Sequence, residues 1–157
     1  MITVLLLFQL LITPLKGYQH GDIKDSTTVY VVLHSDESGS AKSTLAYLKR
    51  TNKSYNYFID RAGKIYQLVD PKYSANHAGW TLYRGLRNWN NFSIGICFAN
   101  NNRQDYTEAQ YQSGKALIAM LKHRYSDLTD DHIVRHRDIA RFRGKTDPLN
   151  FDMARIF

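Results

Sequence analysis

Cysteine is almost absent from this sequence of 157 residues, because Cys97 stands alone, and this excludes an internal disulfide framework. Long apolar runs are missing as well. The longest one, within the first 17 residues, is shorter than the roughly 20 residues that a transmembrane helix needs. The formal charge is +7, yet no run of five or more basic residues occurs, so we expect no dedicated nucleic-acid partner. The positive charge favours another anionic partner, such as a cell-wall polymer.

The amino-terminal segment differs in composition from the rest of the chain. Residues 1–17 read MITVLLLFQLLITPLKG, which is typical of the apolar part of a secretory signal or membrane-targeting segment. No basic residue precedes the apolar run and no A-x-A-like site follows it, so a helix or strand packed on the domain is the alternative. We expect a polar linker over residues 18–28 and one domain over residues 29–157. This organisation predicts a secreted or extracytoplasmic protein with transient membrane passage; the alternative is a cytoplasmic protein released at lysis.

Hydrophobic periodicity predicts an α/β protein with a single mixed β-sheet flanked by helices. The spacing predicts a β-hairpin around a glycine turn in residues 54–69, and a long irregular loop over residues 70–91. Thr107 and Gln110 form a capping box that predicts the start of the longer helix. The other expected elements are strands over 30–34, 93–98 and 132–136, and helices over 41–50, 107–124 and 153–157.

Two histidines occupy equivalent places in this pattern. His34 and His136 each end an apolar strand, and Asp147 lies in the loop after the second of these strands. Ligands gather at the carboxyl ends of strands in open α/β sheets, so parallel neighbouring strands would bring the imidazoles together. Two histidines and one carboxylate, with a position left for water, are typical of a catalytic zinc site. The alternative is two hydrogen-bonded strand-end histidines and a turn aspartate before Pro148.

Four motifs in order carry a resemblance to a known family: VVLHS, NHAGW, FSIGICFAN and HRDIARFRGKTDP. Together they resemble the zinc-dependent N-acetylmuramoyl-L-alanine amidases, the type-2 amidase family that includes phage endolysins and peptidoglycan recognition proteins. The resemblance runs from about Tyr30 to the carboxyl end and implies the type-2 amidase fold. It implies Zn²⁺ as cofactor and peptidoglycan as partner, and we expect a monomer. The implied zinc ligands are His34, His136 and Asp147.

The resemblance also implies roles for residues around the metal. Tyr55 and Lys145 match the catalytic tyrosine and lysine, with Lys145 facing the scissile carbonyl. His77 matches a histidine that lines the cleft without binding metal, and the alternative is a structural histidine bonded to a loop carbonyl. Many members carry a catalytic glutamate where this chain has Cys97, which places a carboxylate general base in doubt. Strand alternation puts Cys97 on the same face as Ser93 and Gly95, so we expect it on the floor of the cleft. The loop arginines, Arg143 among them, are candidates for binding the carboxylates of the stem peptide.

The predicted function is hydrolysis of the amide that joins N-acetylmuramic acid to L-alanine in peptidoglycan. One alternative is a non-catalytic peptidoglycan-binding module of the same fold, which would be expected to lack a metal ligand. A cysteine hydrolase is a second alternative, but Cys97 lies in mid-strand rather than at the helix start typical of a nucleophilic thiol. A basic nucleic-acid-binding or regulatory protein is the third.

Overall fold

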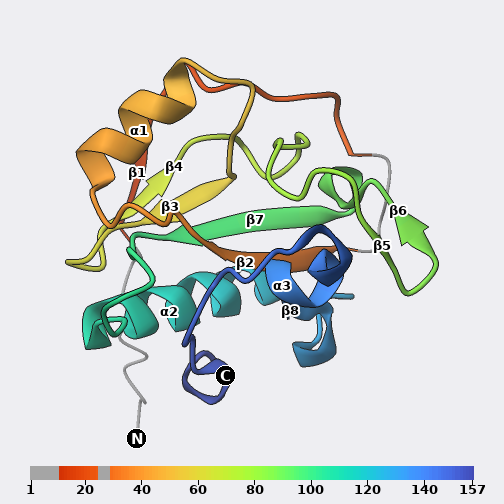
Figure 1. Cartoon of the computed structure of the whole chain (residues 1–157). Coiled ribbons are helices and arrows are strands. Elements are labelled where there is room, and N and C mark those ends of the chain that lie inside the picture. Colours follow the sequence, from red (N-terminus) through yellow and green to blue (C-terminus); the bar gives the residue numbers. More distant parts are fainter. Residues whose placement is uncertain (1–10, 25–28) are drawn as a thin grey trace, which may run out of the picture.

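A six-stranded mixed sheet forms the centre of the protein (Figure 1). The structure is a computed structural model, and it describes residues 11–24 and 29–157. The strands lie in the order β1-β4-β3-β7-β2-β8. Five neighbouring pairs make up the sheet, of which only β3 and β4 are antiparallel. The strands are β1 (Ile12–Pro14), β2 (Tyr30–Ser35), β3 (Tyr57–Ile59), β4 (Ile65–Gln67), β7 (Ser93–Phe98) and β8 (Ile133–Arg135).

The two central strands are buried on both faces, as parallel strands between helical layers should be. Every residue of β2 and of β7 is buried, and the strands pair in register from Tyr30 opposite Ser93 to Ser35 opposite Phe98. Side chains alternate between the two faces. The predicted α/β class with one mixed sheet is therefore confirmed.

Helices cover opposite faces of the sheet (Figure 1). The longer helix α2 (Glu108–Arg124) packs Leu117, Ile118 and Leu121 against one face, in a cluster with side chains of β2, β3 and β7. The short helix α1 (Ala41–Lys49) covers the other face, where Leu48 packs against Phe58 and Cys97. Both helices start where the sequence predicts them. Thr107 and Gln110 form the capping box of α2, and the Ser40 hydroxyl accepts a hydrogen bond from the Ser43 amide.

The structure near the amino terminus differs from the expected division into a targeting segment and a linker. Residues 1–10 lie outside the described residues, but Ile12–Pro14 forms the edge strand β1 and pairs in parallel with β4. Tyr18, within the expected linker, is buried against the sheet. A strand packed on the domain, the alternative to a targeting segment, thus describes residues 12–14. No helix among residues 11–24 and 29–157 combines the length and apolar character needed to cross a membrane.

Three smaller elements differ from the expectation. The loop over residues 70–91 contains a two-stranded hairpin of β5 (Leu82–Tyr83) and β6 (Leu86–Arg87), followed by the 3-10 helix η1 (Trp89–Asn91). The strand expected to end at His136 stops one residue earlier, because His136 begins the short helix α3 (His136–Ile139). The expected closing helix is a single 3-10 turn, η4 (Met153–Arg155).

Candidate metal centre and its cavity

Strand pairing brings the two predicted histidines together. The strands β2 and β8 are parallel neighbours, with Leu33 opposite Arg135. The residues that follow these two are His34 and His136, which therefore lie side by side. The ring centroids of His34 and His136 lie 4.5 Å apart. Both side chains are buried, although they stand at the end of the sheet. The expectation that parallel strands juxtapose the two imidazoles is met.

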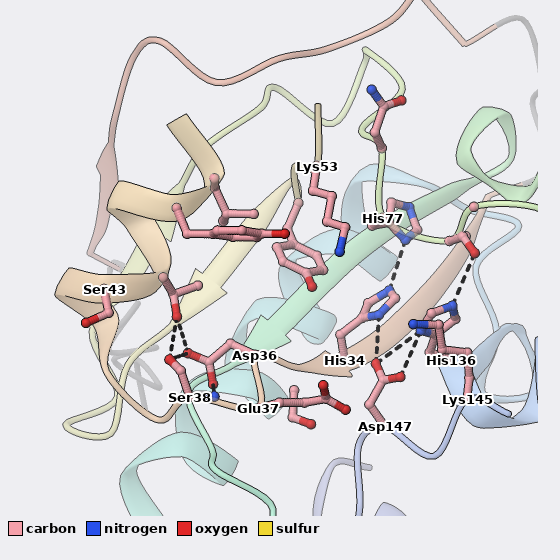
Figure 2. A pocket seen from close by; sticks show the side chains of 18 of the residues that line it. His34, Asp36, Glu37, Ser38, Ser43, Lys53, His77, His136, Lys145 and Asp147 are labelled. Carbon is pink, nitrogen blue, oxygen red and sulfur yellow. Dashed lines mark hydrogen bonds and ion pairs between the residues drawn. The ribbon is translucent and has the colours of Figure 1, made fainter. Parts of the chain in front are cut away.

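Asp147 completes the group from the loop that follows α3. Its Oδ2 lies 3.1 Å from Nδ1 of His34, and its Oδ1 lies 3.0 Å from Nδ1 of His136. One ligand atom from each of the three residues falls within 4.8 Å of the other two. The Asp147 side chain is 8% exposed, so solvent does little to screen its charge. Figure 2 shows the three side chains converging at one end of a cavity.

The hydrogen bond at Nε2 of His136 indicates whether the cluster of His34, His136 and Asp147 suits a metal ion. Nε2 of His136 lies 3.1 Å from the Ala78 carbonyl oxygen, which only accepts hydrogen bonds, so the ring hydrogen sits on Nε2. When Nε2 carries the only ring hydrogen, the lone pair of Nδ1 is directed at the carboxylate of Asp147. Two lone pairs at 3.0 Å repel each other unless a cation lies between them. The donor set, two imidazole nitrogens and a carboxylate oxygen, is one that zinc accepts.

Burial sets the charge states that a metal ion requires. Burial and the neighbouring His136 lower the pKa of His34 to about 4, and burial with the neighbouring His34 holds the pKa of His77 well below its ordinary value. Burial alone would raise the pKa of Asp147, but its contacts with His136 and His34 hold that pKa below the usual range. At neutral pH His34 is therefore neutral and Asp147 is ionised, which are the forms that bind metals.

A cavity of about 420 Å³ opens beside this group. Tyr55 and Lys145, the two predicted catalytic residues, both line it, and the rings of Tyr55 and His34 have centroids 5.1 Å apart. Burial raises the pKa of Tyr55 well above its ordinary value, so its hydroxyl keeps its hydrogen. Lys145 stands next to His136 and Asp147 (Figure 2). The farther wall comes from the loop after β2, from α1 and from the loop after α1, through Asp36, Glu37, Ser38, Ser43, Thr44, Tyr47, Leu48 and Lys53.

Arg143 reaches the cavity but is held by the backbone. Its Nη1 donates hydrogen bonds to the carbonyl oxygens of Ala78 at 2.9 Å and of Trp80 at 3.0 Å. It thus fixes the loop whose carbonyl orients His136, in addition to any contact with substrate. Arg135, at the end of β8, makes a two-point ion pair with Asp138 and points to that partner instead.

The expected place of Cys97 in the cleft is wrong. Cys97 is fully buried, lies beneath Tyr55 in the cluster with Leu48 and Phe58, and is not part of the cavity wall. Strand alternation put it on the correct face of β7, but the side chains above it separate it from the cavity. Burial raises the pKa of its thiol well above the ordinary value, which also argues against a nucleophilic cysteine.

Sequence reasoning missed several groups that shape the site. The Ala78 carbonyl orients His136, and the Ser93 hydroxyl lies 3.3 Å from Nε2 of His77. Alternation along residues 93–98 placed Ser93 on the inner face, but the partner of its hydroxyl depends on the path of the loop over residues 70–91. Lys53 and Glu37, which line the cavity, lie outside the motifs that carried the resemblance.

Comparison with known proteins agrees with this geometry. The family model described as N-acetylmuramoyl-L-alanine amidase matches residues 24–150. The chain belongs to the N-acetylmuramoyl-L-alanine amidase family. The recognised resemblance is thereby confirmed, and with it the type-2 amidase fold.

Named relatives of this amidase are 1,6-anhydro-N-acetylmuramyl-L-alanine amidases called AmpD. The relative from Haemophilus influenzae is 39% identical over 95 residues, which are 60% of this chain and 51% of the relative. That from Escherichia coli is 41% identical over 104 residues, 66% of this chain and 56% of the relative. The matched region thus spans about half the length of these curated relatives.

Solved structures of the family share the fold. A crystal structure of AmpD superposes with a TM-score of 0.77 at 29% identity and covers 92% of both chains. The amidase AmiD from E. coli, in complex with anhydro-N-acetylmuramic acid-L-Ala-D-gamma-Glu-L-Lys, gives a TM-score of 0.72 at 29% identity. That match covers 78% of this chain and 53% of AmiD.

The named relatives contradict the predicted cellular location. A secreted or extracytoplasmic protein was expected from the apolar start of the sequence, but the AmpD relatives are cytoplasmic enzymes, so that prediction is wrong. The apolar run responsible for it falls mostly in residues 1–10, outside the described residues, and residues 12–14 belong to the sheet.

Proposed function

We propose that the chain is a zinc-dependent amidase that cleaves the bond between the lactyl group of N-acetylmuramic acid and L-alanine. The observation that carries this proposal is the convergence of His34, His136 and Asp147 at the end of an open cavity, with ligand atoms within 4.8 Å of one another. Family membership and the names of the relatives support the reaction. We assign the metal as zinc because two imidazoles and one carboxylate leave a position open for reaction.

The side chains around the three ligands have separate tasks in this reaction. Zinc held by His34, His136 and Asp147 would supply a Lewis acid for the scissile carbonyl and for the activation of water. The ammonium of Lys145 stabilises the negative charge that develops on the carbonyl oxygen. Tyr55, whose hydroxyl keeps its hydrogen, donates a hydrogen bond to the same oxygen or orients the attacking water. Lys145, or a water held by Tyr55, delivers the proton to the leaving amine.

The cavity is suited to a muramyl peptide. The substrate in the AmiD complex carries an L-Ala-D-gamma-Glu-L-Lys peptide on anhydro-N-acetylmuramic acid, and we propose a ligand of that class for this chain. Lys53 lines the cavity away from the metal and supplies a positive charge for a carboxylate of the stem peptide. Asp36 is not a free carboxylate, since it accepts hydrogen bonds from Thr44, Ser38 and backbone amides.

A non-catalytic binding module of the same fold is the second candidate. The complete ligand set, with Tyr55 and Lys145 beside it, favours catalysis. A role in lysis or antimicrobial defence, membrane passage and a monomeric state stay predictions from the sequence.

Digestion of purified muropeptides tests the proposal. Mass spectrometry should detect the separated sugar and a peptide with a free L-alanine amino group, when the purified chain is loaded with zinc. A chelator should abolish the products and added zinc should restore them. A zinc-loaded protein that binds muropeptides but releases no product would contradict the amidase and favour the binding module.

A further inference from the structure

A line of hydrogen bonds runs from the backbone of η1 to a metal ligand. The Ser93 hydroxyl lies 2.5 Å from the Trp89 carbonyl oxygen and 3.3 Å from Nε2 of His77. On its other side, Nδ1 of His77 lies 3.0 Å from Nε2 of His34. All four residues are buried, so bulk water does not compete for these contacts.

The direction of each hydrogen bond follows from the first one. A carbonyl oxygen only accepts, so the single hydrogen of the Ser93 hydroxyl points to Trp89. The hydroxyl oxygen must then accept the hydrogen on Nε2 of His77. A neutral His77 has its lone pair on Nδ1, so His34 donates from Nε2. This leaves Nδ1 of His34 without hydrogen, at 3.1 Å from Oδ2 of Asp147.

We infer that Ser93 and His77 are positioning residues that hold His34 in the tautomer that binds metal. Without them, the other tautomer of His34 would direct an N–H group at the carboxylate of Asp147, which is the better local contact in the metal-free protein. A metal ion would then have to displace that hydrogen. Because the hydrogen is held on Nε2, the lone pair of His34 is already directed at the metal position. The inference rests on the proposed zinc site, and it gives His77 a role other than binding substrate.

Strand β7 fixes the position of the His77 ring. Gly95 lies against that ring, and a Cβ atom at Gly95 would come within 2.5 Å of its Cγ atom. The loop that carries His77 is anchored too, because Asn90 Oδ1 accepts the backbone amides of His77 at 3.2 Å and Ala78 at 2.8 Å. The ring therefore has one orientation in which both nitrogens meet their partners.

Nitrogen NMR of the metal-free protein tests the inference directly, because it distinguishes the two tautomers of a neutral histidine. We expect the hydrogen of His34 on Nε2 in the wild type, and a growing fraction on Nδ1 in Ser93→Ala. Zinc affinity is the second measurement, by competition with a chromophoric chelator. Ser93→Ala should bind zinc about 10–100-fold more weakly, the usual effect of losing an outer hydrogen bond to a metal-binding histidine.

Two variants of His77 separate positioning from packing. His77→Asn places an amide oxygen where Nδ1 stood and should keep zinc affinity close to that of the wild type. His77→Gln reaches toward Ser93, leaves Nε2 of His34 without its acceptor, and should weaken zinc binding as Ser93→Ala does. Ser113→Ala is the matched control. Ser113 lies on helix α2, and its hydroxyl also donates to a backbone carbonyl, that of Gly63 at 2.6 Å, so the variant removes a comparable hydrogen bond outside the site.

The outcomes distinguish this inference from the proposed function. A wild-type protein whose His34 carries its hydrogen on Nδ1 overturns the inferred positioning role of Ser93 and His77. A folded Ser93→Ala protein with unchanged tautomer and zinc affinity overturns it as well. Failure of the wild type to bind zinc refutes the proposed metal centre, whereas the tautomer measured without metal still decides the direction of the hydrogen bonds.

Discussion

The Ala78 carbonyl shows how one backbone atom governs the chemistry of two side chains. It accepts hydrogen bonds from Nε2 of His136 and from Nη1 of Arg143. The first contact fixes the tautomer of a proposed metal ligand, and the second holds the loop in place. A basic residue at the edge of a cleft thus contributes to the site through the backbone, which its charge alone does not reveal.

Lys145 is the residue whose loss should separate binding from catalysis. Lys145→Ala should retain zinc, because the three ligands remain, and should lower kcat by roughly 100–1,000-fold, as loss of one oxyanion contact does. Turnover of a muropeptide and metal content, measured on the same sample, check this expectation. Lys64→Ala removes an exposed lysine from the hairpin and serves as the control. Full activity of Lys145→Ala would refute the assigned role.

Asp147 should decide whether zinc stays bound. Asp147→Asn keeps the shape of the side chain but removes the one negative charge among the three ligands. We expect the purified variant to lose zinc on dialysis under conditions in which the wild type keeps it, as metal analysis will show. Retention of zinc at wild-type affinity would mean that the carboxylate is not a ligand.

Residue-level prediction from the sequence succeeded where strand ends fixed the position. His34, His136 and Asp147 were expected together because parallel strands end at one edge, and the structure places them there. The Ala78 and Trp89 carbonyls escaped prediction because their directions depend on the path of an irregular loop, which no local pattern encodes. Arg143 was assigned by charge, and charge does not indicate a backbone partner.

At the scale of elements, β7 supplies the space that the site needs. Its inward residues are Ser93, Gly95 and Cys97, which are small enough to let His77 and Tyr55 lie on the strand. The sequence predicted this strand and its small face correctly. It assigned residues 12–14 to a targeting segment because the start of the sequence is apolar, with a packed strand as the alternative, and Ile12–Pro14 adds an edge strand to the sheet.

Gly95→Ala tests the contact between β7 and His77. The added Cβ would lie within 2.5 Å of the ring, so the ring must move and zinc affinity should fall together with stability. Gly114→Ala is the matched control, because its Cβ would lie 2.7 Å from Ile156 and 2.9 Å from Phe98 in the core on the other face. The control should lose stability but keep its zinc affinity. Equal zinc affinities in both variants would contradict the prediction.

The start of α2 offers a test of fold stability apart from the site. Thr107 accepts the Gln110 amide at 3.1 Å and donates to the Arg61 carbonyl at 2.9 Å, which ties the helix to the hairpin. Thr107→Ala should lower the free energy of unfolding by about 0.5–2 kcal/mol, the usual cost of losing such a cap. Thr107→Ser keeps the hydroxyl and should lose less. Urea unfolding provides the measurement, and zinc affinity should not change in either variant.

For the whole molecule, burial of the site makes stability depend on pH. The sheet and its loops enclose neutral imidazoles that the unfolded chain would expose to water. Such groups accept protons more readily when the chain unfolds, so acid favours the unfolded state. The three proposed ligands would thus couple the metal centre to the fold as a whole, because zinc that binds only the folded chain would stabilise it.

His34 fixes the pH range of this effect. Its folded pKa of about 4 lies below the ordinary value of 6.5, so between these values the unfolded chain binds a proton that the folded chain does not. The free energy of unfolding of the metal-free protein should therefore fall as pH drops from 6.5 to 4, with about 3 kcal/mol of the loss due to His34 and a further part due to His77. Urea unfolding across this range measures the slope. His34→Asn should reduce the slope and leave the part that His77 contributes, whereas His123→Gln, at an exposed position on α2, should leave it unchanged. A wild-type curve without slope in this range would show that His34 is not held neutral by the fold.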